Sequence, residues 1–285
     1  SMQNQGVEVA LSTRNIHTKN FMWTTNFNFA YNNNKILKEA LREDALEPGR
    51  EGYPVGALFA LKTAGLDEEG YPMFQDKDGK AVSAMEFFKL QEWGFGATDL
   101  TARERRELYT YVGTADCPYT GGFNNTFTYK AFELGVNFSF DFGGKVRSQP
   151  TYSIVDFDKG RNTNRDILNR WTPENTETIF PVLLSQNERL DEYMWYSNQN
   201  EIYRNLDIWI RDLNYVRLQN IRLGYTLPTN FSRKLGMTSA TIAIEGRNLL
   251  VFGSSYKNYL DPETMSNAYA TPAPKSVTLS LNLNF

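Results

Sequence analysis

The chain has 285 residues, with 30 Lys and Arg against 33 Asp and Glu and a formal net charge of −3. This balance leaves no basic surface for nucleic acid. The single cysteine, Cys117, excludes an internal disulfide, and the single histidine, His17, excludes a metal site built on paired imidazoles. We therefore expect no nucleic-acid partner, no metal and no cofactor.

The apolar residues follow a strand pattern. No run approaches the roughly 20 apolar residues of a membrane-spanning helix, and the N-terminal stretch lacks the regions of a signal peptide. Aromatic residues nevertheless make up 14% of the chain, and apolar residues recur at every second position in several stretches. Such alternation predicts strands with one apolar face, as in a membrane barrel of low mean hydropathy.

Seven stretches alternate in this way and predict an antiparallel, all-β arrangement. Their apolar positions are 7, 9 and 11; 21, 23, 27, 29 and 31; 123, 127 and 129; 132, 134, 136, 138, 140 and 142; 221, 223, 225 and 227; 242 and 244; and 277, 279, 281, 283 and 285. In the fifth stretch, Val216 and Leu218 have the opposite parity from Ile221. This slip indicates a β-bulge or the point where the strand leaves the apolar layer.

The connections between these stretches alternate in length. They are short at 15–20, 130–131 and 228–238, long at 32–118 and 144–213, and intermediate at 253–275. All short turns then lie at one end of the sheet, an arrangement typical of outer-membrane barrels and uncommon in compact soluble domains. Short helices are expected within the first long connection, at 83–93 and 101–111.

The possible catalytic and metal-binding groups have simpler explanations. Asp76, Asp78 and Gly79 resemble the start of a calcium loop, but the later acidic ligand is missing, so a plain turn is the better interpretation. His17 lies in a short turn without a nucleophile signature nearby. We expect no enzyme and no catalytic residue.

Several segments, in the same order along nearly the whole chain, resemble the SusC/RagA family of TonB-dependent transporters. They are GVEV at 6–9, YPVG at 53–56, YTGGFNN at 119–125, RWTPEN at 170–175, YVRLQNIRLGY at 215–225, GRNL at 246–249 and LNLNF at 281–285. The resemblance implies a plugged barrel of about 22 strands. It also implies energy from TonB and a SusD-like surface lipoprotein that captures oligosaccharides or peptides.

On this resemblance, residues 1–285 are the C-terminal portion of the barrel, forming about its last seven transmembrane strands. The long connections then lie outside the cell, in a protein of the outer membrane. The chain shows no signal peptide, TonB box or plug domain, so TonB would act through a missing N-terminal region. A fragment with two open sheet edges is expected neither to insert into a membrane nor to conduct.

Aromatic residues are the candidate contacts. In the long connections, the candidate contacts with partner or cargo are Trp93, Tyr109, Trp171, Trp195 and Tyr196. The alternative interpretation is that these side chains form the small cores of the connections themselves. Near strand ends, Phe21, Trp23, Phe142, Tyr225 and Phe285 fit girdles at the membrane interface with outer-membrane lipid.

The opposite strand face is polar and is expected to line the barrel lumen. Its predicted members are Glu8, Ser12, Glu133, Asn137, Asp141, Glu245 and Arg247. An ordinary antiparallel sheet with one solvated face has the same pattern. A soluble carbohydrate-binding or adhesion β-domain is therefore the alternative function, and a hydrolase on a β-scaffold is a third.

Overall fold

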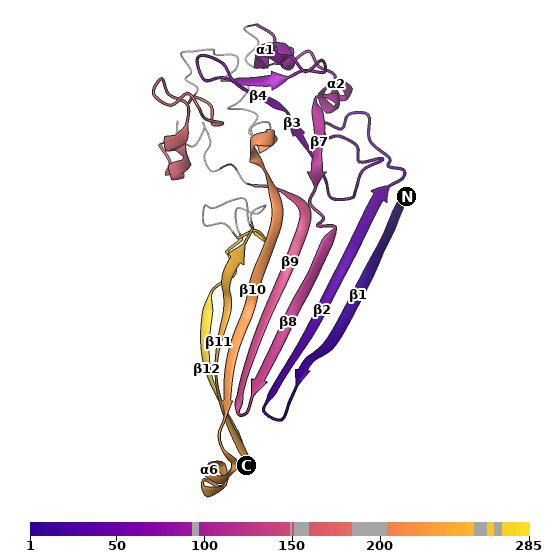
Figure 1. The fold of residues 1–285 in the computed structure, drawn as a ribbon. Coiled ribbons are helices and arrows are strands. Elements are labelled where there is room, and N and C mark those ends of the chain that lie inside the picture. The colour runs from indigo at the N-terminus through magenta and orange to yellow at the C-terminus, as the bar shows by residue number, and fades with distance from the viewer. Residues whose placement is uncertain (93–96, 149, 151–159, 184–203, 254–260, 265–269) are drawn as a thin grey trace.

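The computed structural model describes residues 1–92, 97–148, 150, 160–183, 204–253, 261–264 and 270–285. These residues form one long, curved antiparallel sheet with a smaller body at one end (Figure 1). In this described part, no helix has the length and apolar character needed to cross a membrane.

The sheet has seven strands in the order β1-β2-β8-β9-β10-β11-β12, with β1 and β12 at its two edges. The strands are β1 (Met2–His17), β2 (Phe21–Ile36), β8 (Tyr119–Tyr129), β9 (Phe132–Arg147), β10 (Ile210–Thr226), β11 (Ser239–Phe252) and β12 (Ser276–Asn284). Every neighbouring pair is antiparallel. All seven predicted strands are therefore confirmed.

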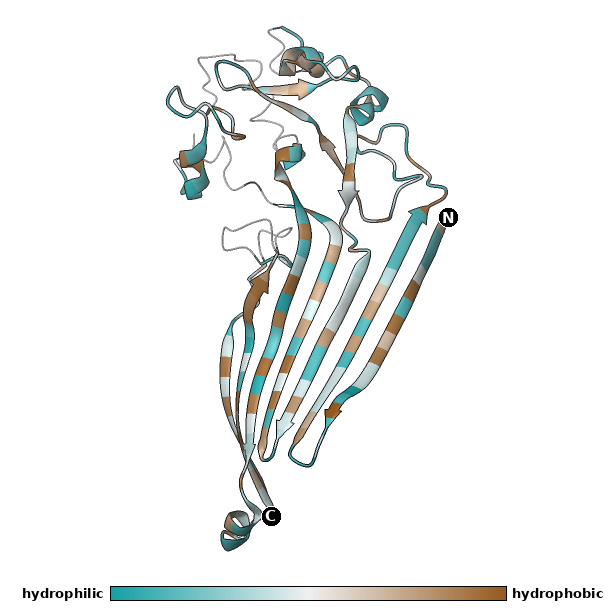
Figure 2. Ribbon diagram, in the orientation of Figure 1, coloured by the Kyte–Doolittle hydropathy of each residue, from teal (hydrophilic) through white to brown (hydrophobic). Residues whose placement is uncertain are grey.

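The connections also lie where their lengths predict. The short turns after β1, β8 and β10 gather at one end of the sheet, and the long connections lie at the other (Figure 1). The third short connection includes a small helix, α6 (Thr229–Lys234). Figure 2 shows alternating hydrophobic and hydrophilic bands along the strands, as expected when successive side chains point to opposite faces.

The parity slip in the fifth strand is a β-bulge. Leu218 pairs with Phe138 on β9, whereas Asn220 pairs with the adjacent Asn137, so β10 carries one extra residue, Gln219. The register against β11 shifts at the same level, where Asn248 has a φ of 53°. The bulge keeps Leu218 on the apolar face although its parity differs from that of Ile221.

The described residues of the two long connections fold into one outer body. Its strands are β3 (Ala57–Leu61), β4 (Thr63–Leu66), β5 (Pro72–Gln75), β6 (Ala81–Val82) and β7 (Tyr109–Thr114), and its helical turns are α1 (Ala84–Phe87), α2 (Ala102–Glu107), η1 (Arg165–Asn169) and η2 (Asp207–Trp209). β3 pairs with β7, and β4, β5 and β6 form a second small sheet.

Residues from both connections share the core of this body. Phe74 is fully buried and stacks on Phe87 with 4.8 Å between ring centroids, and Leu206 and Trp209 from the second connection join the same cluster. Ser148 at the end of β9 fixes the body to the sheet, because its backbone N–H and its hydroxyl both donate to the Trp209 carbonyl at 2.9 Å.

The helices expected in the first connection are shorter than predicted. The helix predicted at 83–93 is present as α1, and residue 93 lies outside the described residues. The helix predicted at 101–111 ends at Glu107, and Tyr109–Thr114 is strand β7 instead. Tyr109 is a strand residue because it pairs with Leu61 beside the buried core, a long-range contact that local helix propensity does not include.

The β8–β9 turn gives a test of this geometry. Lys130 has a φ of 53°, a left-handed conformation that costs a non-glycine residue about 1–2 kcal/mol. We expect K130G to raise the free energy of unfolding by up to about 1 kcal/mol, since glycine adopts this φ without strain. A131G, at a position without positive φ, is expected to lower it. Urea unfolding measures the free energy of unfolding of both variants. An equal loss of this free energy in K130G and A131G would contradict the left-handed conformation of Lys130.

Candidate functional site

One face of the seven-stranded sheet, here called the apolar face, presents exposed aliphatic side chains. Val277, Leu279 and Leu281 on β12 are 68%, 76% and 59% exposed, and Val7 and Leu11 on β1 are 60% and 55% exposed. A soluble two-sheet sandwich would bury such residues against a second sheet. The sheet therefore leaves uncovered the surface that a soluble fold hides.

Aromatic side chains cross the apolar face in two rows. The turn-side row contains Phe21, Tyr129, Phe132 and Tyr225, which are register partners on four adjacent strands. The loop-side row contains Tyr31, Tyr119 and Phe142, again on adjacent strands. Both rows are in ring contact: Phe132 and Tyr225 have centroids 4.6 Å apart, and Tyr31 and Tyr119 have centroids 5.1 Å apart.

The two rows bound an apolar band of membrane height. Phe21 and Tyr31 lie on the same strand ten positions apart, a span of about 33 Å along the strand. At the strand tilt of about 40° found in membrane barrels, this projects to a height of about 25 Å, which matches the apolar band of outer-membrane proteins.

The five predicted interface aromatics occupy different places on this face. Phe21 and Tyr225 belong to the turn-side row and Phe142 to the loop-side row. Trp23 lies one step inside the turn-side row, and its indole N–H donates to Asn125 Oδ1 at 2.9 Å. Phe285 follows β12 and is 84% exposed. Their contact with lipid stays a prediction.

The opposite face, here called the polar face, carries a row of hydrogen-bonding side chains, all but one of them uncharged. One residue from each strand takes part in register, namely Ser12, Asn26, Asn124, Asn137, Asn220, Arg247 and Ser276. Ser12 Oγ donates to Asn26 Oδ1 at 2.6 Å, and Asn137 Nδ2 donates to Asn220 Oδ1 at 2.6 Å. Only Arg247 in this row is charged, and it pairs with Glu245 at 2.6 Å.

A buried ionic cluster lies nearer the loop end of the polar face, here called the Arg217 cluster. It joins Arg217 and Tyr215 on β10, Asp141 on β9, and Asp261 and Glu263 from the β11–β12 connection. Arg217 is 2% exposed. Its Nη2 contacts Asp261 Oδ1, and its Nε donates to Glu263 Oε1 at 3.0 Å. The Tyr215 hydroxyl lies 2.5 Å from Asp141 Oδ2 and 3.1 Å from Glu263 Oε1.

The contacts of Asp261 in this cluster favour its charged form. Burial disfavours its charge, but the hydrogen bond from Arg217 and the backbone N–H of Glu263 outweigh burial and hold the pKa of Asp261 below its usual value. Above the pKa of an unfolded aspartate, about 3.9, Asp261 therefore contributes stability, which is lost as pH falls through its lower folded-state pKa. The Arg217–Asp261 pair is ionised at neutral pH.

The Arg217 cluster was not predicted from the sequence. The change of parity at Val216 and Leu218 was the signal that could have pointed to it, because the same bulge turns Arg217 to the polar face. The partners Asp261 and Glu263 lie in a connection whose path no strand pattern predicts. The residues predicted to line the lumen all lie on the polar face. Of these residues, Asp141 takes part in the Arg217 cluster.

The candidate contact residues of the connections lie in the outer body or outside the described part. Trp93, Trp195 and Tyr196 lie outside the described residues. Trp171 packs against Gly70, where an added Cβ would lie 2.4 Å from the indole ring, and Tyr109 packs beside the buried core cluster. Contact of these residues with partner or cargo stays a prediction.

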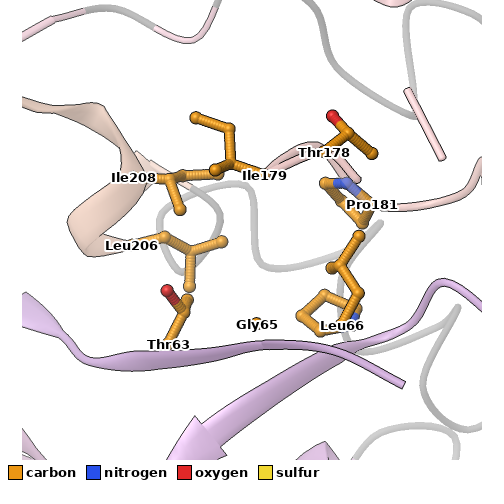
Figure 3. Close-up of a pocket in the computed structure, with 9 residues that line it drawn as sticks. Thr63, Gly65, Leu66, Thr178, Ile179, Pro181, Leu206 and Ile208 are labelled. Atoms are coloured by element: carbon orange, nitrogen blue, oxygen red, sulfur yellow. The ribbon is translucent and has the colours of Figure 1, made fainter. Parts of the chain in front are cut away.

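A small apolar cavity of about 150 Å³ opens in the outer body (Figure 3). Leu66 and Pro72 line it from β4 and β5, and Ile179, Leu206 and Ile208 line it from the second connection. A cavity of this size holds about one small ring, and its largely apolar lining offers few hydrogen-bonding side chains, chiefly Thr63 and Thr178. Within the described residues, no group of three or more His, Cys, Asp or Glu side chains is arranged to hold a metal.

The chain is similar to known receptors along its whole length. It is 27% identical over 312 residues to TonB-dependent receptor P3 of Formosa agariphila and 23% identical over 311 residues to TonB-dependent receptor SusC of Bacteroides thetaiotaomicron. Each match covers 100% of this chain, but only 29% and 26% of those proteins. No family model matches the sequence.

Solved structures give the same result for the fold. The chain superposes over 100% of its length on the RagAB peptide transporter, with a TM-score of 0.68 and 22% identity, and covers 29% of that chain. It superposes on the closed-closed state of the RagAB peptide importer with a TM-score of 0.70 and 23% identity, covering 30% of that chain. The predicted resemblance to the SusC/RagA family is confirmed.

The fold is thus that of a barrel segment of a SusC/RagA-type TonB-dependent receptor. The seven-stranded sheet corresponds to strands of such a barrel, and the outer body is built from its long connections. The sequence prediction of an antiparallel barrel segment with long loops is confirmed in this sense.

Cys117 lies where the outer body meets β8 and reports on that junction. Burial raises the pKa of its thiol, and the nearby Asp141 carboxylate raises it further. Because the thiolate is the reactive form, we expect maleimide to label Cys117 more slowly than the unfolded chain at pH 7. The rate should still rise above pH 9. An exposed thiol introduced as T110C in a C117S background is the control, and equal rates for the two sites would contradict burial.

Proposed function

We propose that this chain forms part of the wall of an outer-membrane TonB-dependent importer. The observation that carries the proposal is the exposed apolar face bounded by two aromatic rows, whose spacing along the strands projects to a height of about 25 Å at the strand tilt of membrane barrels, on a sheet whose other face is polar. In this arrangement the apolar face contacts outer-membrane lipid, and the polar face lines the lumen. The alternative, a soluble carbohydrate-binding or adhesion domain, leaves the exposed face unexplained.

The domain assignment follows from the same proposal. Residues 1–285 form the C-terminal portion of the barrel, and strands outside this chain pair with β1 and β12 to close the wall. The relatives have names of receptors and transporters, which supports transport rather than catalysis. Residues of the parent protein outside this chain provide the contact with TonB.

The proposed cargo is an oligosaccharide or a peptide, delivered by a SusD-like surface lipoprotein that docks on the outer body. The peptide class is supported by the names of similar structures, the RagAB peptide transporter and the RagAB peptide importer, and the oligosaccharide class comes from the family resemblance of the sequence. The outer body suits this role because it is compact, lies at the loop end of the strands and has its own buried core (Figure 1).

Insertion of a charge tests the lipid-facing assignment. Val277 is 68% exposed on the apolar face, four positions along the register from the turn-side row, and Thr278 beside it points to the polar face. We expect V277R to lower the free energy of unfolding of the full-length receptor in lipid vesicles by about 2 kcal/mol or more, because a charge near the bilayer centre is poorly solvated. T278R should change it by less than about 1 kcal/mol. Equal losses would refute the proposed orientation.

Uptake by the native host tests the transport function. We expect deletion of the gene to abolish energy-dependent accumulation of fluorescently labelled oligosaccharides or labelled peptides, and the intact gene in trans to restore it. Co-purification of a surface lipoprotein with the receptor tests the proposed partner. Normal accumulation of every labelled oligosaccharide and peptide after deletion would refute the import function.

A further inference from the structure

Residues 261–264 of the β11–β12 connection lie away from the two strands that the connection joins. β12 pairs with β11 on the side away from β10, so a direct connection would not cross β10. Asp261 and Glu263 nevertheless reach Arg217 on β10, and Glu263 also reaches the Tyr215 hydroxyl, which contacts Asp141 on β9. The segment Asp261 to Thr264, here called the strap, therefore lies over the polar face of β10 and β9, although the connection to which it belongs joins β11 to β12.

Charge pairing holds the strap in this position. Arg217 is 2% exposed, and a buried guanidinium is costly unless carboxylates neutralise it and fill its hydrogen-bonding positions. Two of its partners, Asp261 and Glu263, come from the strap. Removal of the strap would leave Arg217 uncompensated, and removal of the Arg217 charge would leave the side chain of Asp261, 7% exposed, without its counterion.

The strap also has a defined local conformation. The Glu263 backbone N–H donates to Asp261 Oδ1 at 3.0 Å, and the Thr264 N–H donates to the Asp261 carbonyl at 2.9 Å. Asp261 thus fixes the turn and binds Arg217 with the same carboxylate. Glu263 is the outer member, since its side chain is 46% exposed. Of the two strap carboxylates in the cluster, Asp261 is buried and Glu263 is accessible to water.

We propose that the Arg217 cluster is an ionic latch that holds the strap against the polar face of β10 and β9, so that the strap moves off this face only when the latch opens. The latch itself depends on the contacts above. Its consequence for transport rests on the proposed function: where the polar face lines the lumen, the latched strap occupies part of the passage.

Amide hydrogen exchange in the strap tests the latch. The experiment uses the full-length receptor in detergent, with mass spectrometry of peptides that cover residues 261–264. We expect R217Q and D261N to accelerate exchange there by at least about tenfold, because each removes a charge-assisted hydrogen bond from a buried pair. E263Q should have a smaller effect, since its side chain is half exposed.

R222Q is the matched control. Arg222 lies on the same strand and the same face, and it pairs with Glu133 at 3.1 Å with its side chain 32% exposed. Strap exchange in R222Q should equal that of the parent protein. Heat-modifiable migration of the folded barrel on gels confirms that each variant is folded, and the nearly isosteric D261N and half-exposed E263Q provide readouts if R217Q does not fold.

Unchanged strap exchange in the folded D261N and E263Q variants would overturn the latch, and so would an equal acceleration in R222Q. Hydrogen exchange in detergent does not depend on cargo, TonB or a partner lipoprotein. The latch can therefore fail while import is intact, and import can fail while the latch is intact.

Discussion

The structure depends on one constraint, which is that all seven strands must present side chains of matching register to the same face. Side chains alternate with a period of two, so a slip of one residue in any strand would move its whole apolar set to the polar side. Adjacent strands are held in register over nine to fifteen paired positions, for example by the unbroken pairing of β8 with β9 from Tyr119 to Tyr129. Two chemically distinct surfaces result from this pairing together with the alternation of apolar and polar residues along each strand.

The β10 bulge shows how closely the two surfaces depend on each other. With regular pairing through Gln219, Arg217 would share the apolar face with Ile221. On the proposed function this face contacts hydrocarbon, where a charge costs about 2.5–3.5 kcal/mol. The extra residue instead turns Arg217 to the polar face, where it pairs with carboxylates, and it returns Leu218 to the apolar face. The bulge, the buried arginine and the position of Asp261 and Glu263 are thus parts of one arrangement.

Sequence reasoning predicted the features that depend on local alternation. Sequence patterns correctly predicted two strands, at Phe132 to Phe142 and at Val277 to Leu283, and the short turn at Lys130 and Ala131. They did so because a period of two depends only on neighbouring residues. The strand at Tyr109 was missed, since its partner Leu61 is distant in sequence. Asp261 and Glu263 were missed for the same reason: their role appears only when the connection meets Arg217 in space.

The shared core of the outer body links parts of the chain that are far apart in sequence. Phe74 and Phe87 come from the first long connection, and Leu206 and Trp209 come from the second. Because interiors are close-packed, a larger side chain in one connection requires a smaller one in the other. During evolution, the two long connections of this chain are therefore expected to change together, and an exchange of one connection between similar proteins is expected to succeed only when its packing partner is exchanged as well.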